Sequence, residues 1–396
     1  MIRSDILIVG GGIIGLTLAR QLIGRGSIAL IEKDFCGAHA SGRNSGVVHA
    51  GLYYKQGTLP ARLCVKGNAM LKAYCLENKV PFQNIGKIVA PKDDSEVEFV
   101  HKLYQNSLRN GAPAHLIDYD EAKEIEPRII RKEKYVWSPS TSIAGNKELI
   151  AALKNEVISK GVKVYEGTQF VKKLKQTATS TEILTNKGKA YSNLVINCAG
   201  TYTDKIAQDF GFGLNYKIMP MRGFYLYGHR QVEGFKTLVY PLPLGDGSML
   251  GVHTTNTVSG RFNLGPTALP GLWREQYGGL QNFSLIECLN SLSIYLNCIR
   301  SPDLRLYKHM LLEEVKKLSR KYVVNDVATM VHGLNLPDYQ EWGPTGIFPQ
   351  LVDTANYQMV KDFIVEGDHL SKHLLNVVSP GWTCSFALAE ELSLSL

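Results

Sequence analysis

The pattern of apolar and polar residues predicts a chain that alternates between strands and helices. At the N-terminus, an apolar run at residues 6–9 leads into a glycine-rich turn, an amphipathic run at residues 13–22 and a second apolar run that ends on Glu32. Short apolar runs are typical of buried strands, and apolar residues that recur every three or four positions are typical of helices. Residues 5–32 therefore predict a strand, a tight turn, a helix and a second strand.

The same two patterns recur over most of the chain. Helices are predicted at residues 62–78, 96–110, 146–160, 284–298, 307–322 and 383–394. Strands are predicted at residues 87–91, 162–166, 169–174, 182–185, 194–197, 224–227, 238–240, 249–253, 261–264, 363–366 and 374–378. Strands interspersed with helices indicate an α/β (mixed α+β) protein, and residues 215–265 indicate a second region that is mainly sheet.

The glycine-rich turn has the spacing of a dinucleotide-binding site. Gly10, Gly12 and Gly15 follow the first strand, and Glu32 comes about 20 residues later. Gly10 permits the turn, Gly12 lets the backbone approach a pyrophosphate, and Gly15 lets helix and strand pack closely. The helix N-terminus stabilises the phosphate charge, and Glu32 accepts a hydrogen bond from a ribose hydroxyl. The alternative is a glycine-rich turn that binds nothing.

Three further segments have the composition of turns that contact an extended cofactor. The alternatives are a surface turn, an ordinary strand-to-helix turn and a capped helix that binds nothing. Residues 41–51 are small and polar, Ala199 and Gly200 end an apolar strand, and Gly381 precedes the last helix, whose N-terminus would stabilise negative charge on a reduced flavin. FAD is long and is held from several strands, so this arrangement favours FAD over a nicotinamide cofactor. The predicted cofactor-binding residues are Gly10, Gly12, Ile13, Ile14, Gly15, Glu32, Lys33, Ser41, Arg43, Asn44, Ser45, Gly46, Val47, Val171, Ala199, Gly200, Asp204, Gly346, Gly381, Trp382 and Thr383.

These patterns predict two domains. A discontinuous Rossmann-like FAD-binding domain comprises residues 1–80, 145–210 and 340–396. A β-sheet substrate-binding domain comprises residues 81–144 and 211–339, with a helical insertion at residues 271–330.

Composition narrows the class of protein. The chain has 396 residues, 44% of them hydrophobic, and a net charge of +8, which suits anionic ligands. Its seven cysteines form no CxxC pair, so we expect no metal site. We expect no nucleic-acid partner, because no basic recognition motif is present. The first strand begins at residue 5 and no apolar run approaches about 18 residues, so we expect a cytoplasmic protein without a targeting peptide.

The helical insertion at residues 271–330 is rich in basic and aromatic residues. It carries Trp273, Lys308, Lys316, Arg320 and Tyr322 among others. Such a segment can rest on an anionic bilayer, which predicts peripheral contact with the cytoplasmic face of a membrane. The alternative is a solvated helical cap over the substrate-binding domain.

The chain resembles FAD-dependent oxidoreductases of the D-amino-acid-oxidase type, and within them the L-2-hydroxyglutarate dehydrogenase/oxidase family. The resemblance covers nearly the whole chain, and its most specific motifs are NSGVVHAGLYYK and GVHTT. The matching stretches are residues 44–55, 63–67, 220–223, 239–243, 250–255 and 264–266.

The resemblance implies that an L-2-hydroxy acid is oxidised to a 2-oxo acid. FAD, which we expect to be held non-covalently, would take a hydride at flavin N5 and pass electrons to a quinone or to oxygen. The hydroxyl proton needs a base, and His253, at the end of a predicted strand, suits that role as a neutral imidazole. His49 is the competing base, or a group packed on the flavin. The alternative for His253 is a core histidine that donates to a backbone carbonyl.

An anionic carboxylate substrate needs cations and polar donors. Arg222 could form a bidentate pair with a carboxylate, and Lys55, which follows Tyr54, and Thr255 are further candidates. Relatives usually carry an arginine where this chain has Phe348. If that arginine binds a distal carboxylate, this chain should prefer a monocarboxylate or a more apolar 2-hydroxy acid.

Two other functions remain open from the sequence. The chain could be an amine or amino-acid oxidase of the same fold, in which His253 would be a bystander. It could also be a non-catalytic protein that binds FAD as a structural element, an alternative to which Phe348 gives some weight.

Overall fold

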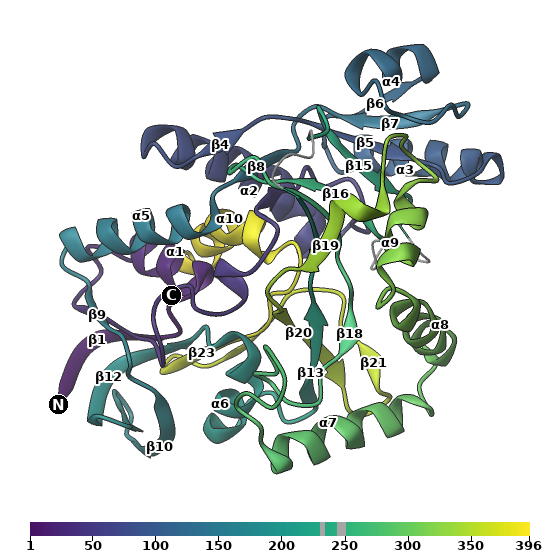
Figure 1. Ribbon diagram of the computed structural model, residues 1–396. Helices are drawn as coiled ribbons and strands as arrows, with labels where there is room; N and C mark the ends of the chain where they lie inside the picture. The colour runs from purple at the N-terminus through teal and green to yellow at the C-terminus, as the bar shows by residue number, and fades with distance from the viewer. Residues whose placement is uncertain (230–233, 244–250) are drawn as a thin grey trace.

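The computed structural model describes residues 1–229, 234–243 and 251–396, and its largest sheet has eight strands (Figure 1). Strands β9, β2, β1, β12 and β23 run parallel to one another, while β10, β11 and β22 add antiparallel pairs. The strands of this sheet are β1 (Ile2–Val9), β2 (Ile28–Ile31), β9 (Lys163–Tyr165), β10 (Phe170–Gln176), β11 (Thr181–Thr185), β12 (Gly188–Asn197), β22 (Ile364–Gly367) and β23 (Ser371–Asn376).

Helices cover both faces of this sheet because its central strands are apolar on both sides. In β1, Ile6 and Ile8 belong to one buried cluster and Leu7 and Val9 to another. The first cluster includes residues of α1 (Ile13–Gln21), α2 (Leu59–Glu77), α5 (Asn146–Ser159) and α10 (Gly381–Ser393). The second includes residues of α6 (Thr203–Phe210), on the opposite face of the sheet.

The parallel strands bring separate parts of the sequence to one edge of the sheet. Strands β1, β2 and β12 are in parallel register, so Val9, Ile31 and Asn197 end at the same edge. In open α/β sheets this carboxyl edge is where nucleotides bind. The glycine-rich turn and the residues after β12 therefore lie next to each other, although almost 190 positions separate them.

Smaller sheets form the second part of the molecule. One contains β13 (Tyr216–Gly223), β18 (Leu269–Pro270), β20 (Gly346–Asp353) and β21 (Gln358–Met359). Another contains β14 (Leu226–Gly228), β16 (His253–Asn256), β17 (Phe262–Gly265) and β19 (Tyr339–Trp342). A third contains β5 (Lys87–Ala90), β6 (His115–Ile117), β7 (Tyr135–Ser138) and β15 (Leu238–Pro241), with α3 (Val97–Arg109) and α4 (Tyr119–Ile125) beside it. Strands β3 (Val47–Val48), β4 (Phe82–Gln83) and β8 (Ser142–Ala144) form a small connecting sheet.

Three helices form the segment predicted as an insertion, and they lie at the outer edge of the molecule (Figure 1). They are α7 (Leu285–Cys298), α8 (Leu304–Lys316) and α9 (Arg320–Val327). The prediction of a single helix at residues 307–322 is wrong, because α8 ends at Lys316 and a new helix, α9, begins at Arg320. Ser319 caps α9 by accepting a hydrogen bond from the Tyr322 amide. None of the described helices combines the length and apolar character needed to cross a membrane.

Most other predicted helices and strands are present, with ends displaced by a few residues. The prediction of a strand at residues 249–253 falls partly outside the described residues, and β16 begins at its last residue. The mixed α/β fold class is confirmed. The boundaries of the two domains stay a prediction.

Candidate active site

A cavity of about 970 Å³ runs from the carboxyl edge of the largest sheet to the strands of the second part. Val9, Ile31 and Ala199 line its nucleotide end, and Tyr225, Tyr240 and His253 line its other end. This volume is at the upper end of the range for small-molecule and cofactor sites, which extends to about 1,000 Å³. The cavity is therefore large enough for an extended dinucleotide.

The turn after β1 requires glycine at two positions. Gly10 has φ +113°, and a Cβ there would lie 2.4 Å from the carbonyl oxygen of Cys198. A Cβ on Gly15 would lie 2.0 Å from the carbonyl oxygen of Gly10. No side chain fits at these separations, so the sequence folds here into the close strand–turn–helix contact that the spacing predicts.

Glu32 and Ser41 hold the backbone at the nucleotide end. Glu32 is buried, and its carboxylate accepts from the amides of Gly11, at 2.7 Å, and Asp34, at 3.0 Å. Ser41, in the 3-10 turn η1 (Ala40–Gly42), accepts from the Ile13 amide at 2.9 Å. Because each carboxylate oxygen has a second lone pair, Glu32 can still accept from a hydroxyl in the cavity.

Two of the other predicted segments meet near the start of α10. The hydroxyl of Thr383 accepts from the amide of His49 at 3.0 Å, which fixes the loop after β3 against the helix. The Trp382 indole N–H is buried and has no partner among the described residues. Gly381 and Trp382 both line the cavity, so the N-terminus of α10, which no side chain caps, lies at the wall. The Gly381 amide donates to the carbonyl oxygen of Val378, and the next amides of the first turn have no acceptor within the helix.

Most predicted site residues line the cavity. They are Gly10, Gly12, Ile13, Ile14, Glu32, Lys33, Ser41, Arg43, Asn44, Ser45, Val47, His49, Tyr54, Lys55, Val171, Ala199, Gly200, His253, Gly346, Phe348, Gly381 and Trp382. Gly15, Gly46 and Thr383 lie behind this wall, where they shape the turn, the loop and the start of the helix.

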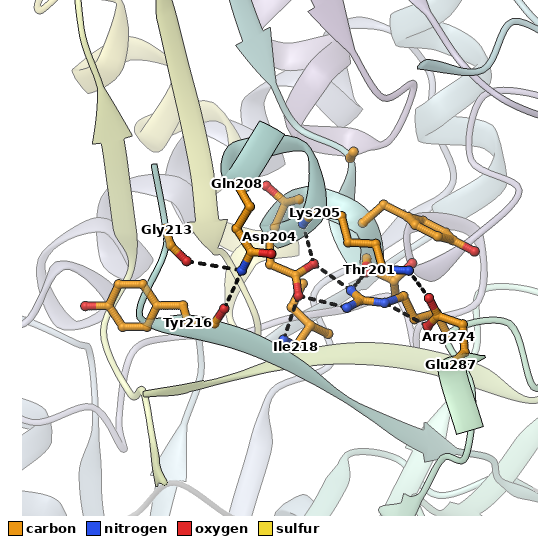
Figure 2. A network of polar contacts seen from close by, with 12 residues as sticks. Thr201, Asp204, Lys205, Gln208, Gly213, Tyr216, Ile218, Arg274 and Glu287 are labelled. Atoms are coloured by element: carbon orange, nitrogen blue, oxygen red, sulfur yellow. Dashed lines mark hydrogen bonds and ion pairs between the residues drawn. The ribbon is translucent and has the colours of Figure 1, made fainter. Parts of the chain in front are cut away.

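Asp204 does not line the cavity, which is a correction to the sequence prediction. It lies in a network of polar contacts with Arg274 and Ile218 (Figure 2). Its carboxylate accepts hydrogen bonds from both terminal nitrogens of Arg274, at 2.6 and 2.8 Å, and from the amide of Ile218, at 2.9 Å. Arg274 also donates to Glu287 of α7 at 2.9 Å. Asp204 therefore joins α6 to the segment at residues 271–330, and its carboxylate is used in that contact.

Arg222 and Thr255 are also placed away from the cavity. On β13, Met221 and Gly223 line the cavity, so Arg222 points to the opposite side of the strand, where it packs against Gly271. Thr255 is fully buried in β16, two residues past His253, and is not part of the wall. The alternation of side chains along a strand explains the position of Arg222, and sequence spacing alone does not reveal which face is the cavity face.

His253 is buried, and one of its ring nitrogens is already used. Its Nδ1 lies 2.8 Å from the carbonyl oxygen of Gly251 and so donates a proton to it. The ring stacks on Tyr240, with 3.6 Å between ring centroids. Burial lowers the pKa of His253 to about 3, so the imidazole is neutral near pH 7. This tautomer leaves Nε2 unprotonated and able to accept a proton.

A second group at the same end comprises the half-buried His49 and the buried Tyr53 and Lys87. Burial lowers the pKa of His49 to about 3, and its Nδ1 has no partner among the described residues. The Tyr53 hydroxyl also has none, although Tyr53 lines the cavity. Lys87 is fully buried behind this wall. Neither Tyr53 nor Lys87 is marked as a site residue by the sequence pattern. A lysine at the start of an apolar strand normally has a solvated head group.

The comparisons with known proteins agree with this geometry. Residues 5–393 match the DAO family, described as FAD dependent oxidoreductase. The chain belongs to this family. The oxidoreductase is 32% identical to the L-2-hydroxyglutarate dehydrogenase of Indibacter alkaliphilus, over 97% of this chain and 96% of the relative. It is 30% identical to the enzyme of that name from Escherichia coli, over 98% and 92%. It is 32% identical to a mitochondrial one from Caenorhabditis elegans, over 99% and 92%.

Solved structures share the fold of this oxidoreductase. L-α-glycerophosphate oxidase from Mycoplasma pneumoniae, solved with FAD bound, superimposes with a TM-score of 0.79 at 21% identity, over 99% of this chain and 94% of that chain. Glycine oxidase from Geobacillus kaustophilus gives 0.73 at 18% identity, over 100% and 95%. The cofactor is FAD, and the glycine turn, the buried Glu32 and the unpartnered Trp382 N–H all fit it.

Proposed function

We propose that the enzyme oxidises the 2-hydroxyl group of a small L-2-hydroxy acid, with L-2-hydroxyglutarate as the first substrate to test. The observation that carries this proposal is His253, a neutral buried imidazole whose Nδ1 is tied to Gly251 and whose ring lines the cavity. Oxidation of an alcohol needs such a base, whereas a deprotonated amine does not. Relatives named L-2-hydroxyglutarate dehydrogenase support the choice of substrate.

His253 would act by accepting the hydroxyl proton of the substrate at Nε2. The C2–H and O–H bonds break, the C2=O bond forms, and the ring leaves the step as an imidazolium. When bound, FAD supplies the acceptor for the hydrogen and the two electrons that leave C2. Tyr240 stacks on the ring and Gly251 holds Nδ1, so these contacts fix the orientation of the base.

The substrate carboxylates would be bound by residues at the same end of the cavity. Lys55 and Tyr54 line the wall, and we propose them as carboxylate contacts. Phe348, which also lines it, is apolar and packs next to Met221 on the paired strand. An apolar wall at this position favours a substrate with one carboxylate or an apolar distal group.

The visible spectrum of the purified holoenzyme under anaerobic conditions tests the proposal. We expect the flavin band to bleach when L-2-hydroxyglutarate is added. If it bleaches only with a monocarboxylic 2-hydroxy acid, the reaction stands and Phe348 explains the preference. Bleaching only with amino acids would replace the proposal by an amino-acid oxidase. A flavin that neither class reduces would indicate a non-catalytic FAD-binding protein.

The reduced enzyme must pass its electrons on, and we propose a quinone reached from the membrane surface, with oxygen as the alternative. Supporting this, residues 280–318 carry half of the exposed large apolar side chains of the described chain. The exposed apolar residues of α7 form one stripe along the helix. On the opposite, inner face of α7, Ile294 and Cys298 pack on β13. The stripe residues are Leu285, Ile286, Leu289, Leu292 and Leu296.

Charge favours an anionic bilayer as the partner of this stripe. Exposed Arg300, Arg305, Lys308 and Lys321 have no ion pair among the described residues. Basic residues beside an exposed apolar stripe are typical of helices that lie in a membrane interface. The predicted aromatic contribution is wrong for Trp273, which is buried against Phe283.

Vesicle flotation of the holoenzyme tests the membrane contact. We expect binding to vesicles that contain phosphatidylglycerol, weak binding to pure phosphatidylcholine, and loss of binding in the double variant Leu289→Glu with Leu296→Glu. Leu108→Glu is the matched control, because Leu108 is an exposed leucine on α3. Unchanged flotation of the double variant would contradict the proposal, and a concentration-dependent dimer lost in that variant would assign the stripe to a second copy of the chain.

A further inference from the structure

Lys87 is a buried cation without a counter-ion among the described residues. It lies at the start of β5, its side chain is fully buried, and its Nζ has no hydrogen-bond partner in the described part of the chain. A buried unpaired ammonium group is destabilising, which makes Lys87 a candidate for a role in the site.

Two tyrosine rings separate Lys87 from the cavity. Its Nζ lies 4.4 Å from the ring centroid of Tyr53 and 4.9 Å from that of Tyr240. Both rings line the cavity, and Tyr240 stacks on His253. The faces of aromatic rings attract a cation, so the two tyrosines hold the ammonium group directly behind the wall at the base.

We propose that Lys87 is a positioning residue that attracts the anionic substrate to the His253 end of the cavity. The proposal rests on the proposed function, since it assumes a carboxylate substrate there. In a dry, protein-lined site a charge acts through several ångströms of protein more strongly than in water. The arriving carboxylate would serve as the missing counter-ion of Lys87.

The groups that face Lys87 leave its charge free to respond to pH. They are Tyr53 and His49 from the loop after β3, Cys64 from α2, Tyr240 from β15 and His253 from β16. None of them is a carboxylate. Burial lowers the pKa of Lys87 to about 7, whereas burial lowers the pKa of both histidines to about 3, so only the lysine changes charge near neutral pH.

The charge of Lys87 also affects the base. A positive charge at this distance disfavours protonation of both His49 and His253, in addition to the larger effect of burial. The lysine would therefore keep His253 neutral in the free enzyme, and the negative charge of the bound substrate would offset that effect when the proton is transferred.

Binding of glutarate, a dicarboxylate that cannot be oxidised at C2, tests this role without turnover. Its dissociation constant for the holoenzyme is measured by the change that it causes in the flavin spectrum, from pH 5.5 to 9. For the wild type we expect binding to weaken as pH rises through about 7. Lys87→Met should weaken binding about tenfold at low pH and remove the pH dependence. Lys87→Arg should keep tight binding at every pH, because arginine stays charged.

The controls separate charge from fold and from the choice of substrate. Lys123→Met is the matched control, because Lys123 is an exposed lysine over the ring of Tyr119, away from the cavity. The uncharged analogue glutaramide should bind wild type and Lys87→Met alike. A Lys87→Arg profile identical to that of the wild type would overturn the proposal, as would unchanged glutarate binding in Lys87→Met. If glutarate binds as expected but no hydroxy acid reduces the flavin, the proposed reaction fails while the anion-attracting role stands.

Discussion

The two ends of the cavity differ in how completely their polar groups are paired. At the nucleotide end, Glu32 accepts hydrogen bonds from two backbone amides and Ser41 accepts one from a third. At the other end, the Nδ1 of His49, the hydroxyl of Tyr53 and the Nζ of Lys87 are buried without partners among the described residues. Buried polar groups are normally paired, so the backbone at the nucleotide end is held by the protein before FAD binds, whereas the second end has unpaired groups that a ligand can pair with.

The difference also concerns the origin of the residues. At the nucleotide end, the turn, Glu32 and the helix between them come from one continuous segment, residues 5–32, and β12 only completes the edge. The other end takes Tyr53, Lys87, Tyr240 and His253 from four strands or loops spread over 200 positions. The first end therefore has a local segment at its centre, whereas the second exists only after the sheets have assembled.

The largest expected effect is at the unpaired end. His253→Ala should retain FAD but reduce the rate of flavin reduction by about 10²- to 10⁴-fold, because the hydroxyl proton loses its acceptor. Anaerobic stopped-flow measurement of flavin bleaching checks this. His101→Ala, an exposed histidine on α3, is the control. A normal reduction rate in the His253 variant would exclude it as the base and would favour His49.

Removal of a paired group outside the cavity should act on stability alone. Arg274→Met leaves the buried carboxylate of Asp204 without its cation, which should cost about 3–5 kcal/mol of unfolding free energy. Thermal and urea unfolding of the holoenzyme measure this loss. The exposed ion pair between Arg62 and Glu391 is the control, and Arg62→Met should change the unfolding free energy by less than about 1 kcal/mol. An equal loss in both variants would show that Asp204 and Arg274 are not a structural pair.

At the paired nucleotide end, the expected effect is on cofactor retention. Glu32→Ala strands two buried amides and removes the ribose acceptor, so FAD affinity should fall by about ten- to a hundredfold. The release of flavin fluorescence on dilution measures it. Substrate preference should not change. Unchanged FAD affinity would contradict the ribose role.

Substitution of Phe348 should change substrate preference, and this effect should be smaller than those above. Phe348→Arg places a cation on the cavity wall and should raise flavin reduction by L-2-hydroxyglutarate relative to a monocarboxylic 2-hydroxy acid, by about tenfold. The ratio of kcat/KM for the two substrates measures the change. An unchanged ratio would place the side chain at residue 348 outside the reach of the substrate.

The pH dependence of stability should report His49 and His253. Their pKa values fall from 6.5 when unfolded to about 3 in the native state, so the unfolded chain binds more protons below pH 6.5. Stability from each histidine is fully present above pH 6.5 and is lost as the pH falls toward 3, at about 1.4 kcal/mol per pH unit. His49→Gln should make the fall in melting temperature between pH 6.5 and 4.5 shallower. An identical slope would show that His49 is not buried neutral.

The sequence by itself determined the fold class, most helices and strands, and the nucleotide-binding segment. These features depend on neighbours in the chain, such as the spacing of Gly10, Gly12 and Gly15, so local periodicity and backbone sterics are sufficient. The family resemblance also pointed to His253 and His49, which both line the cavity, and their roles stay a prediction. The break between α8 and α9 was missed because apolar spacing continues across it.

Only the tertiary structure decided which side chains reach the cavity. A strand presents alternate residues to opposite sides, and the packing of sheets sets which side is the wall, so Arg222 was predicted at the site and lies behind it. Asp204 was assigned to the cofactor and pairs with Arg274 instead, 70 positions away. In the sequence, Lys87 resembles any surface lysine. Folding buries its side chain and leaves its Nζ without a hydrogen-bond partner or counter-ion among the described residues, and the sequence does not reveal this.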